Sequence, residues 1–207
     1  MIHWFLKAKH WQIFLGYAGI FLLTMILLFS SIFSIILSVD RISEGPENFL
    51  FPFWIFLPMV LLMVYDLLYH WNVGGKLHSL IPKPGKFKIS YLYWSLAFPV
   101  IFIFLIFVGV AIFAITITPE IDNPRPFLTG MIILIPLQLL AMLCQFYRIY
   151  FMARAVKSVE LGRLARFDEC IVECILFWFW IVGIWIIQPR INELYDKSLR
   201  NTLPEEE

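Results

Sequence analysis

Residues 91–118, YLYWSLAFPVIFIFLIFVGVAIFAITIT, form a run of 28 positions without a charged side chain. A helix of about 20 apolar residues crosses the roughly 30 Å hydrocarbon core of a membrane, so this run is long enough to span it. Four further apolar runs occur, and the five together cover more than half of the chain. They are residues 13–39, 49–68, 127–152 and 171–187. The sequence therefore predicts an integral membrane protein.

The overall composition indicates the same class. Apolar residues make up 61% of the chain and charged residues 15%, with a net charge of +1. Soluble domains have about 45–50% apolar and about 25% charged residues, and disordered chains contain still fewer apolar residues. The unbroken runs also lack the roughly 10-residue alternating segments of membrane β-barrels. We therefore predict an all-α fold, in which residues 1–207 form a single membrane domain, a bundle of four transmembrane helices with a further C-terminal membrane segment.

Positive charge predicts the orientation of the bundle. With a cytoplasmic N-terminus, the first four helices leave 11 Lys and Arg inside and two outside, as the positive-inside rule requires. A fifth span over 171–187 would place the last three basic residues outside, whereas a re-entrant segment keeps them inside. This run is also short for a span and carries three Trp, which favour interfacial depth. We favour a re-entrant or steeply tilted segment, with a fifth span as the alternative.

Two of the long runs carry polar side chains at helical spacing. In the first run, small hydroxyl residues follow one stripe: Thr24, Ser31, Ser34 and Ser38. Small residues let membrane helices approach closely, so we interpret this stripe as a helix-packing surface rather than a substrate path. In the fourth run, Gln138, Gln145 and Arg148 share a face and form a polar seam. Interhelical hydrogen bonding is its simplest role, and a transport path is the alternative.

Charged residues near the ends of the runs are the remaining candidates. Three acids lie at membrane edges: Asp66, Glu169 and Glu173. A charge in or beside a membrane segment costs several kcal/mol, so each is a candidate functional residue, although a structural ion pair is the simpler interpretation. Two basic stretches are predicted to contact anionic lipid headgroups. Their residues are Lys76, Lys83, Lys86, Lys88, Arg154, Lys157, Arg163 and Arg166.

Motifs for catalysis or cofactor binding are absent from the sequence. None of the four histidines lies inside an apolar run, which argues against haem held between membrane helices. HExxH, GxSxG and phosphate-loop patterns do not occur, and the three cysteines form no CxxC pair. We therefore expect no metal, no cofactor and no nucleic-acid partner, and we assign no catalytic residue.

The C-terminal third contains the stretch ELGR at Glu160–Arg163 and the stretch GIWIIQPRIN at Gly183–Asn192. Together these motifs resemble a family of small uncharacterised bacterial inner-membrane proteins with several helices. The resemblance covers less than a fifth of the chain. It implies a bacterial inner-membrane location and a compact multi-helix fold, and it carries no activity.

Three functions are compatible with these observations. The first is a non-enzymatic membrane subunit or scaffold that associates with other membrane proteins in a larger assembly. The second is a small transporter or channel-like protein that uses the polar seam of the fourth run. The third is an interfacial lipid-processing enzyme that would use His70, His78 and Asp66 near the headgroups. We expect the first.

Overall fold

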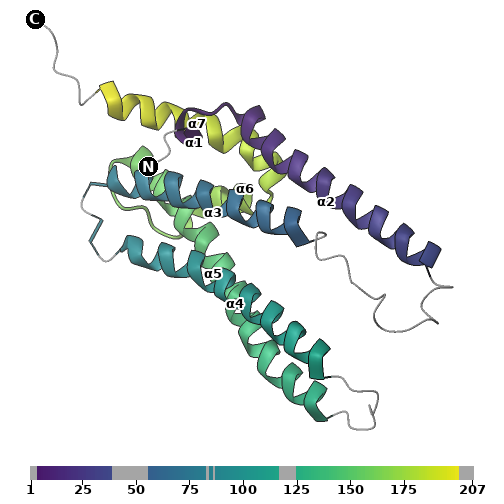
Figure 1. Ribbon diagram of the computed structural model, residues 1–207. Helices are drawn as coiled ribbons and strands as arrows, with labels where there is room; N and C mark the ends of the chain where they lie inside the picture. Colours follow the sequence, from purple (N-terminus) through teal and green to yellow (C-terminus); the bar gives the residue numbers. More distant parts are fainter. Residues whose placement is uncertain (1–3, 39–55, 83, 86, 117–124, 201–207) are drawn as a thin grey trace, which may run out of the picture. The chain divides into compact units, whose positions relative to one another are not determined.

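A computed structural model describes residues 4–38, 56–82, 84–85, 87–116 and 125–200. All regular elements within these ranges are helices (Figure 1). Three of them, α2 (His10–Ser38), α4 (Ile89–Thr116) and α5 (Arg125–Leu161), contain stretches long and apolar enough to cross a membrane. These stretches are His10–Ser30, Ile89–Gly109 and Ile132–Leu161. The predicted all-α fold, with apolar helices long enough to cross a membrane, is therefore confirmed for the described residues. The start of the second predicted run, residues 49–55, lies outside the described ranges.

The chain divides into two compact units, each with its own core. The first unit comprises residues 1–73 and 180–207, and its helices are α1 (Trp4–Lys7), α2, the first part of α3 (Phe56–Ser79) and α7 (Trp180–Arg200). The N-terminal half of α2 lies beside α7 (Figure 1). The core of this unit is formed by fully buried apolar side chains. They include Leu6, Ile13, Tyr69, Ile184, Ile187 and Ile191.

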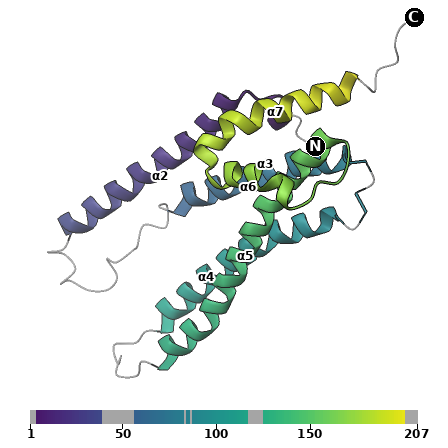
Figure 2. The same ribbon diagram turned by 180° about the vertical axis from the view of Figure 1, so that it is seen from behind.

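Residues 74–179 form the second unit. Here α4 runs along α5, and a short 3-10 turn (Asp168–Cys170) leads into α6 (Ile171–Trp178), which packs on α5 (Figure 2). Between α5 and this turn the chain reverses at Gly162, whose φ of 65° favours glycine. The buried core includes Leu77, Leu92, Phe151, Met152 and Val156.

Helix α3 continues to Ser79, well beyond residue 68, where the apolar run ends. The pair Gly74-Gly75 is helical, although adjacent glycines are typical of a loop. A Cβ atom on Gly74 would lie 2.6 Å from Leu92 Cδ2 and 3.0 Å from Met152 Sδ. Glycine fits here because α3 meets α4 and α5 closely, and a Cβ atom would have to displace the buried side chains of Leu92 and Met152. Close packing, rather than turn formation, explains this residue.

The last apolar run, 171–187, is divided between two helices. Helix α6 ends at Trp178, and Phe179 has non-helical backbone angles, φ −88° and ψ 60°. At 1.5 Å per residue, the 8 residues of α6 are about 12 Å long, less than half of the hydrocarbon thickness. Helix α7 then continues through Pro189 to Arg200, well past the end of the apolar run. The run is thus not one continuous helix.

Candidate functional site

The polar centre of the first unit is Gln188, whose side chain is fully buried. Its amide nitrogen donates to the carbonyl oxygen of Phe5 at 2.8 Å and to Asn192 Oδ1 at 2.9 Å. Its amide oxygen accepts the hydroxyl of Tyr69 at 3.0 Å. Asn192 in turn donates to the carbonyl of Ala8 at 3.0 Å. Two amides of α7 therefore bond α1 and the segment that joins α1 to α2.

Sequence reasoning did not single out Gln188 or Asn192 as site residues. Both lie in the GIWIIQPRIN stretch, and Gln188 directly follows two isoleucines in an otherwise apolar run. A polar amide within such a run is the sequence feature that could have indicated this site, because a buried amide needs hydrogen-bond partners for both its donors and its acceptor. Two of its partners, however, lie far away in the sequence: Phe5 is 183 residues away and Tyr69 is 119 residues away.

Asp66, predicted as a membrane-edge acid, lies in a cluster with Tyr17 and His70. The hydroxyl of Tyr17 donates to Asp66 Oδ1 at 2.8 Å. Nδ1 of the buried His70 lies 3.3 Å from the same oxygen and 2.8 Å from the Asp66 carbonyl. Both of these atoms are acceptors, so a neutral His70 ring carries its proton on Nδ1. The cluster joins α2 to α3 by hydrogen bonds.

Aromatic rings surround this cluster. Tyr17 makes an edge-to-face contact with Tyr65 at 4.8 Å between ring centroids and another with Trp180 at 5.3 Å. The ring of Trp180 also lies 4.9 Å from that of Tyr69. Edge-to-face pairs of this kind each add about 0.5–1.5 kcal/mol beyond the burial of their surface. The Asp66 cluster is therefore part of a packed aromatic layer.

His78, the other histidine proposed for lipid chemistry, lies in the second unit. Its Nε2 is 2.6 Å from the carbonyl oxygen of Phe87, and its ring stacks on Phe151 at 6.1 Å. Since a carbonyl only accepts, Nε2 carries the proton and donates it to this bond. The bond ties the end of α3 to the segment that precedes α4.

The predicted helix-packing stripe is described only in part. The hydroxyl of Thr24 donates to the carbonyl of Ile20 in its own helix at 2.8 Å. The side chains of the other stripe residues, Ser31, Ser34 and Ser38, lie outside the described part of the chain. For Thr24 the described bond is thus intrahelical, a frequent arrangement for Thr in membrane helices.

The polar seam of α5 divides into a buried and an exposed part. Arg148 is buried, with 6% of its surface exposed, and donates to Gln145 Oε1 one turn earlier. Gln138 and Gln145 are exposed, while Ala141 between them is buried. Burial of the seam is therefore confined to Arg148, while its two glutamines are exposed.

Glu169 closes the turn between α5 and α6. The guanidinium of Arg163 donates to both carboxylate oxygens of Glu169, from Nη2 to Oε1 and from Nη1 to Oε2, the latter at 3.0 Å. The backbone amide of Arg166 also donates to Oε2, at 2.7 Å. The Arg163 guanidinium and this amide lower the pKa of Glu169 to about 2, because both favour its charged form. The carboxylate is therefore a structural element of the turn.

Glu173 is paired with a basic residue of α5. Its side chain is 3% exposed, and Oε1 lies 3.4 Å from Nζ of Lys157. The same ammonium group lies 3.5 Å from Glu160. This ion pair joins α6 to α5, with Lys157 as the basic partner.

The basic residues proposed to contact lipid headgroups fall into three groups. Arg154, Lys157 and Arg163 have partners in their own unit, and Arg154 donates from Nε to the carbonyl of Ala165 at 2.9 Å. Lys88 and Arg166 have exposed side chains, and Lys76 is half-buried. Lys83 and Lys86 lie outside the described residues.

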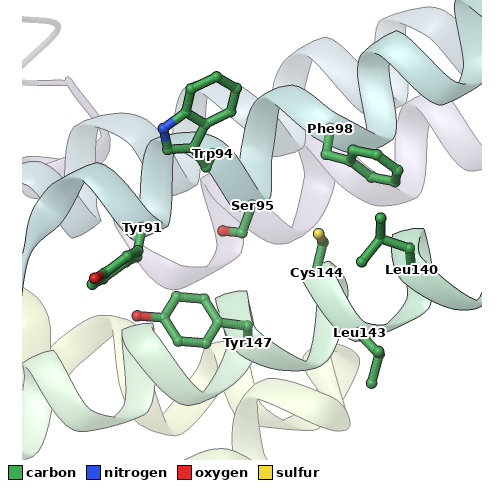
Figure 3. A pocket seen from close by; sticks show the side chains of 8 residues that line it. All are labelled: Tyr91, Trp94, Ser95, Phe98, Leu140, Leu143, Cys144 and Tyr147. Atoms are coloured by element: carbon green, nitrogen blue, oxygen red, sulfur yellow. The ribbon is translucent and has the colours of Figure 1, made fainter.

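Two open hollows lie beside α5 in the second unit. The first, about 500 Å³, lies between α4 and α5 (Figure 3). Its lining is formed by Tyr91, Trp94, Ser95, Phe98, Leu140, Leu143, Cys144 and Tyr147. The second, about 530 Å³, lies between α5 and α6 and shares Tyr147 with the first. Both are nearly all apolar, and neither is lined by the residues of the polar seam.

Cys144, Cys170 and Cys174 are free thiols. Within the described ranges, no group of three or more His, Cys, Asp or Glu side chains could hold a metal ion. Comparison of the sequence with protein-family models and with curated proteins, and of the chain with solved structures, finds no match.

Proposed function

We propose that this protein is a non-enzymatic integral membrane subunit, or scaffold, of a larger membrane assembly. The observation that supports this proposal is how the polar side chains of the described helices are used. Gln188, Asp66 and Glu173 each bond a second segment of their own unit, and Glu169 closes a turn. Polar groups in these positions stabilise helix packing, which is the design of a structural membrane component.

We propose that the partner binds to the exposed surface of helix α2. Only 6% of its most apolar stretch is buried, compared with 22% for α4 and 11% for α5. Its outer half exposes large apolar side chains on successive faces, among them Phe21, Leu22, Ile26 and Phe29. A Cβ atom on Gly19 would meet nothing within 4 Å, whereas one on Gly16 would clash with Tyr65. Gly19 therefore offers the close approach that membrane helices use when they associate.

The proposal includes a topology of four spans. The apolar run predicted over residues 49–68 would supply the fourth, and the short helix α6 would enter the membrane without crossing it. The N-terminus would be cytoplasmic, which follows the positive-inside distribution. We place the protein in a bacterial inner membrane, on the resemblance of its C-terminal motifs.

A transport function is the second candidate, and Arg148 is the residue that favours it. This side chain is buried within the apolar stretch Ile132–Leu161, and a charge at such a position is often part of a solute path. Transport predicts that Arg148→Leu abolishes solute flux in proteoliposomes while the protein remains folded. Flux that continues in this variant would exclude the seam as a path.

The first test of the subunit function is to isolate the protein in mild detergent from cells that express it at its natural level. Mass spectrometry then identifies the proteins that are isolated with it. We expect a stoichiometric membrane partner. Gly19→Leu should release this partner, because the new side chain fills the approach surface without touching its own unit. Gly109→Leu is the matched control, since a Cβ there also meets nothing within 4 Å.

Two results would contradict the proposal. A clean monomer or homo-oligomer from cells that express the protein at its natural level would exclude the subunit function. A partner that stays bound equally well in both glycine variants would exclude α2 as the contact surface.

A further inference from the structure

We propose that the hollow between α4 and α5 binds one acyl chain of an anionic phospholipid, with the headgroup at the end formed by Tyr91 and Tyr147. This inference does not depend on the subunit function. It depends on the membrane location of α4 and α5, on the lining of the hollow and on the charge around one of its ends.

The position of the hollow places it in the hydrocarbon layer. Its walls come from the two apolar stretches Ile89–Gly109 and Ile132–Leu161, both of membrane-spanning length. The hydroxyl of Ser95 donates to the carbonyl of Leu92 at 2.7 Å, so it is already used within its own helix. Phe98 and Leu140 lie at one end (Figure 3). A groove with these walls suits a hydrocarbon chain and offers little to a polar solute.

The other end of the hollow is aromatic and polar. Tyr91 and Tyr147 lie there with their ring centroids 6.4 Å apart in an edge-to-face contact (Figure 3). Tyrosines are enriched where the hydrocarbon meets the headgroups, because the ring is apolar and the hydroxyl needs a polar partner. Tyr91 is also the third residue of α4, at the end of the span. This end therefore marks the headgroup level.

Positive charge is present at the same end. Lys88 directly precedes α4 and is exposed, and its carbonyl accepts the backbone amide of Tyr91 at 3.3 Å. The guanidinium of Arg154 lies 5.7 Å from the ring of Tyr150, which follows Tyr147 by one turn. Arg154 uses its Nε for the Ala165 carbonyl, so its two terminal amino groups still have donors to offer.

Negative charge is absent from the lining of the hollow. No Asp or Glu occurs between residues 67 and 119, or between residues 125 and 159, in the sequence. The next acid of α5 is Glu160, whose carboxylate lies 3.5 Å from the ammonium group of Lys157. A phosphate that carries a net negative charge fits the tyrosine end better than a zwitterionic headgroup, because the lining of the hollow offers no carboxylate to pair with a choline or ethanolamine.

The test is retention of lipid by the full-length protein. The protein is reconstituted into phosphatidylcholine vesicles with phosphatidylglycerol as the minor component, then extracted in mild detergent, and the bound lipids are counted by native mass spectrometry. We expect phosphatidylglycerol to be retained above its share in the vesicle. Cys144→Trp, which fills the hollow, should abolish this retention. Met142→Trp is the matched control, because Met142 is exposed on α5 and lines neither hollow.

Lys88→Gln tests the headgroup end. Removal of one basic residue near an anionic lipid surface should weaken the preference for phosphatidylglycerol over phosphatidylcholine about fivefold. Lys197→Gln, at an exposed position on α7, should leave the preference unchanged. Equal effects of the two lysine substitutions would overturn the assignment of the headgroup.

A second measurement leaves the hollow intact. With Cys170 and Cys174 replaced by serine, Cys144 is the remaining thiol, and its alkylation by a maleimide can be timed. Added phosphatidylglycerol should slow this reaction more than phosphatidylcholine does. The proposal would be overturned if the two lipids gave equal alkylation rates, or if phosphatidylglycerol were retained only at its share in the vesicle. It would also be overturned if both tryptophan variants retained the lipid equally, or if Cys144 cross-linked between two copies. The last result would show that a second copy covers the hollow.

Discussion

Replacement of Gln188 by leucine should destabilise the first unit, although leucine is the more apolar residue. The glutamine is fully buried and bonds Tyr69, Asn192 and the carbonyl of Phe5. Leucine has a similar volume and would leave these three partners without their bond. A buried polar group that loses its partner costs about 1–3 kcal/mol. Taken near the lower end of this range, the three groups together lose about 3 to 5 kcal/mol, which shifts the folding equilibrium by more than a hundredfold.

The assay is unfolding of the purified protein in mild detergent, followed by tryptophan fluorescence, with hydrogen exchange at residues 4–8 as a local probe. Gln138→Leu is the matched control, because Gln138 is exposed on α5 and the same substitution there removes no described bond between segments. Tyr69→Phe in the Gln188→Leu background should recover about 1 kcal/mol, since the orphaned hydroxyl is removed. Equal melting of the two leucine variants, or faster exchange in neither, would refute the role of Gln188 as the anchor of the N-terminal segment.

Three further predictions concern other contacts. Gly74→Ala should lower the free energy of unfolding by about 1–3 kcal/mol, because the added Cβ atom would crowd Leu92 and Met152. Gly19→Ala should have little effect, since a Cβ atom there meets nothing within 4 Å. Equal melting temperatures of the two variants would argue against the close helix contact. Glu169→Gln should destabilise the protein at neutral pH. The pKa of Glu169 is lowered from 4.5 to about 2, so its contribution is complete above pH 4.5 and is lost as the pH falls through 2. Melting curves of the wild type and Glu169→Gln should therefore converge over this range, and a constant difference would contradict the pairing. Lys157→Met should destabilise the second unit more than the double variant Lys157→Met/Glu173→Gln, since the single change leaves a buried carboxylate without its cation. The opposite order in thermal unfolding would show that this pair is not the dominant contact of Glu173.

Local patterns were informative where one helix decides the outcome. The apolar run over 91–118 and its neighbours predicted helices of membrane-spanning length, and α2, α4 and α5 have this length. Asp66, Glu169 and Glu173 also stood out in the sequence as charges beside apolar runs, and each has a polar partner in the structure. The identity of the partner did not follow, as Glu173 shows with Lys157.

Patterns were misleading where a residue serves a contact between segments. Gly74 and Gly75 are typical of a turn, yet here they are helical, because α4 and α5 pack against this face of α3. Similarly, the run over 171–187 looks continuous in hydropathy, but the backbone at Phe179 leaves the helix. Hydropathy measures transfer out of water and contains no information about where a backbone bends.

Length and hydrophobicity are properties of each segment alone, so the residue pattern was enough to predict an all-helical protein with apolar helices long enough to cross a membrane. Which polar groups meet depends instead on the tertiary structure. Gln188 reaches the carbonyl of Phe5 and the hydroxyl of Tyr69, and Tyr17 reaches Asp66. It also formed the hollow between α4 and α5. Each of these hydrogen bonds needs a donor and an acceptor about 3 Å apart, and the two residues lie far from each other in the sequence.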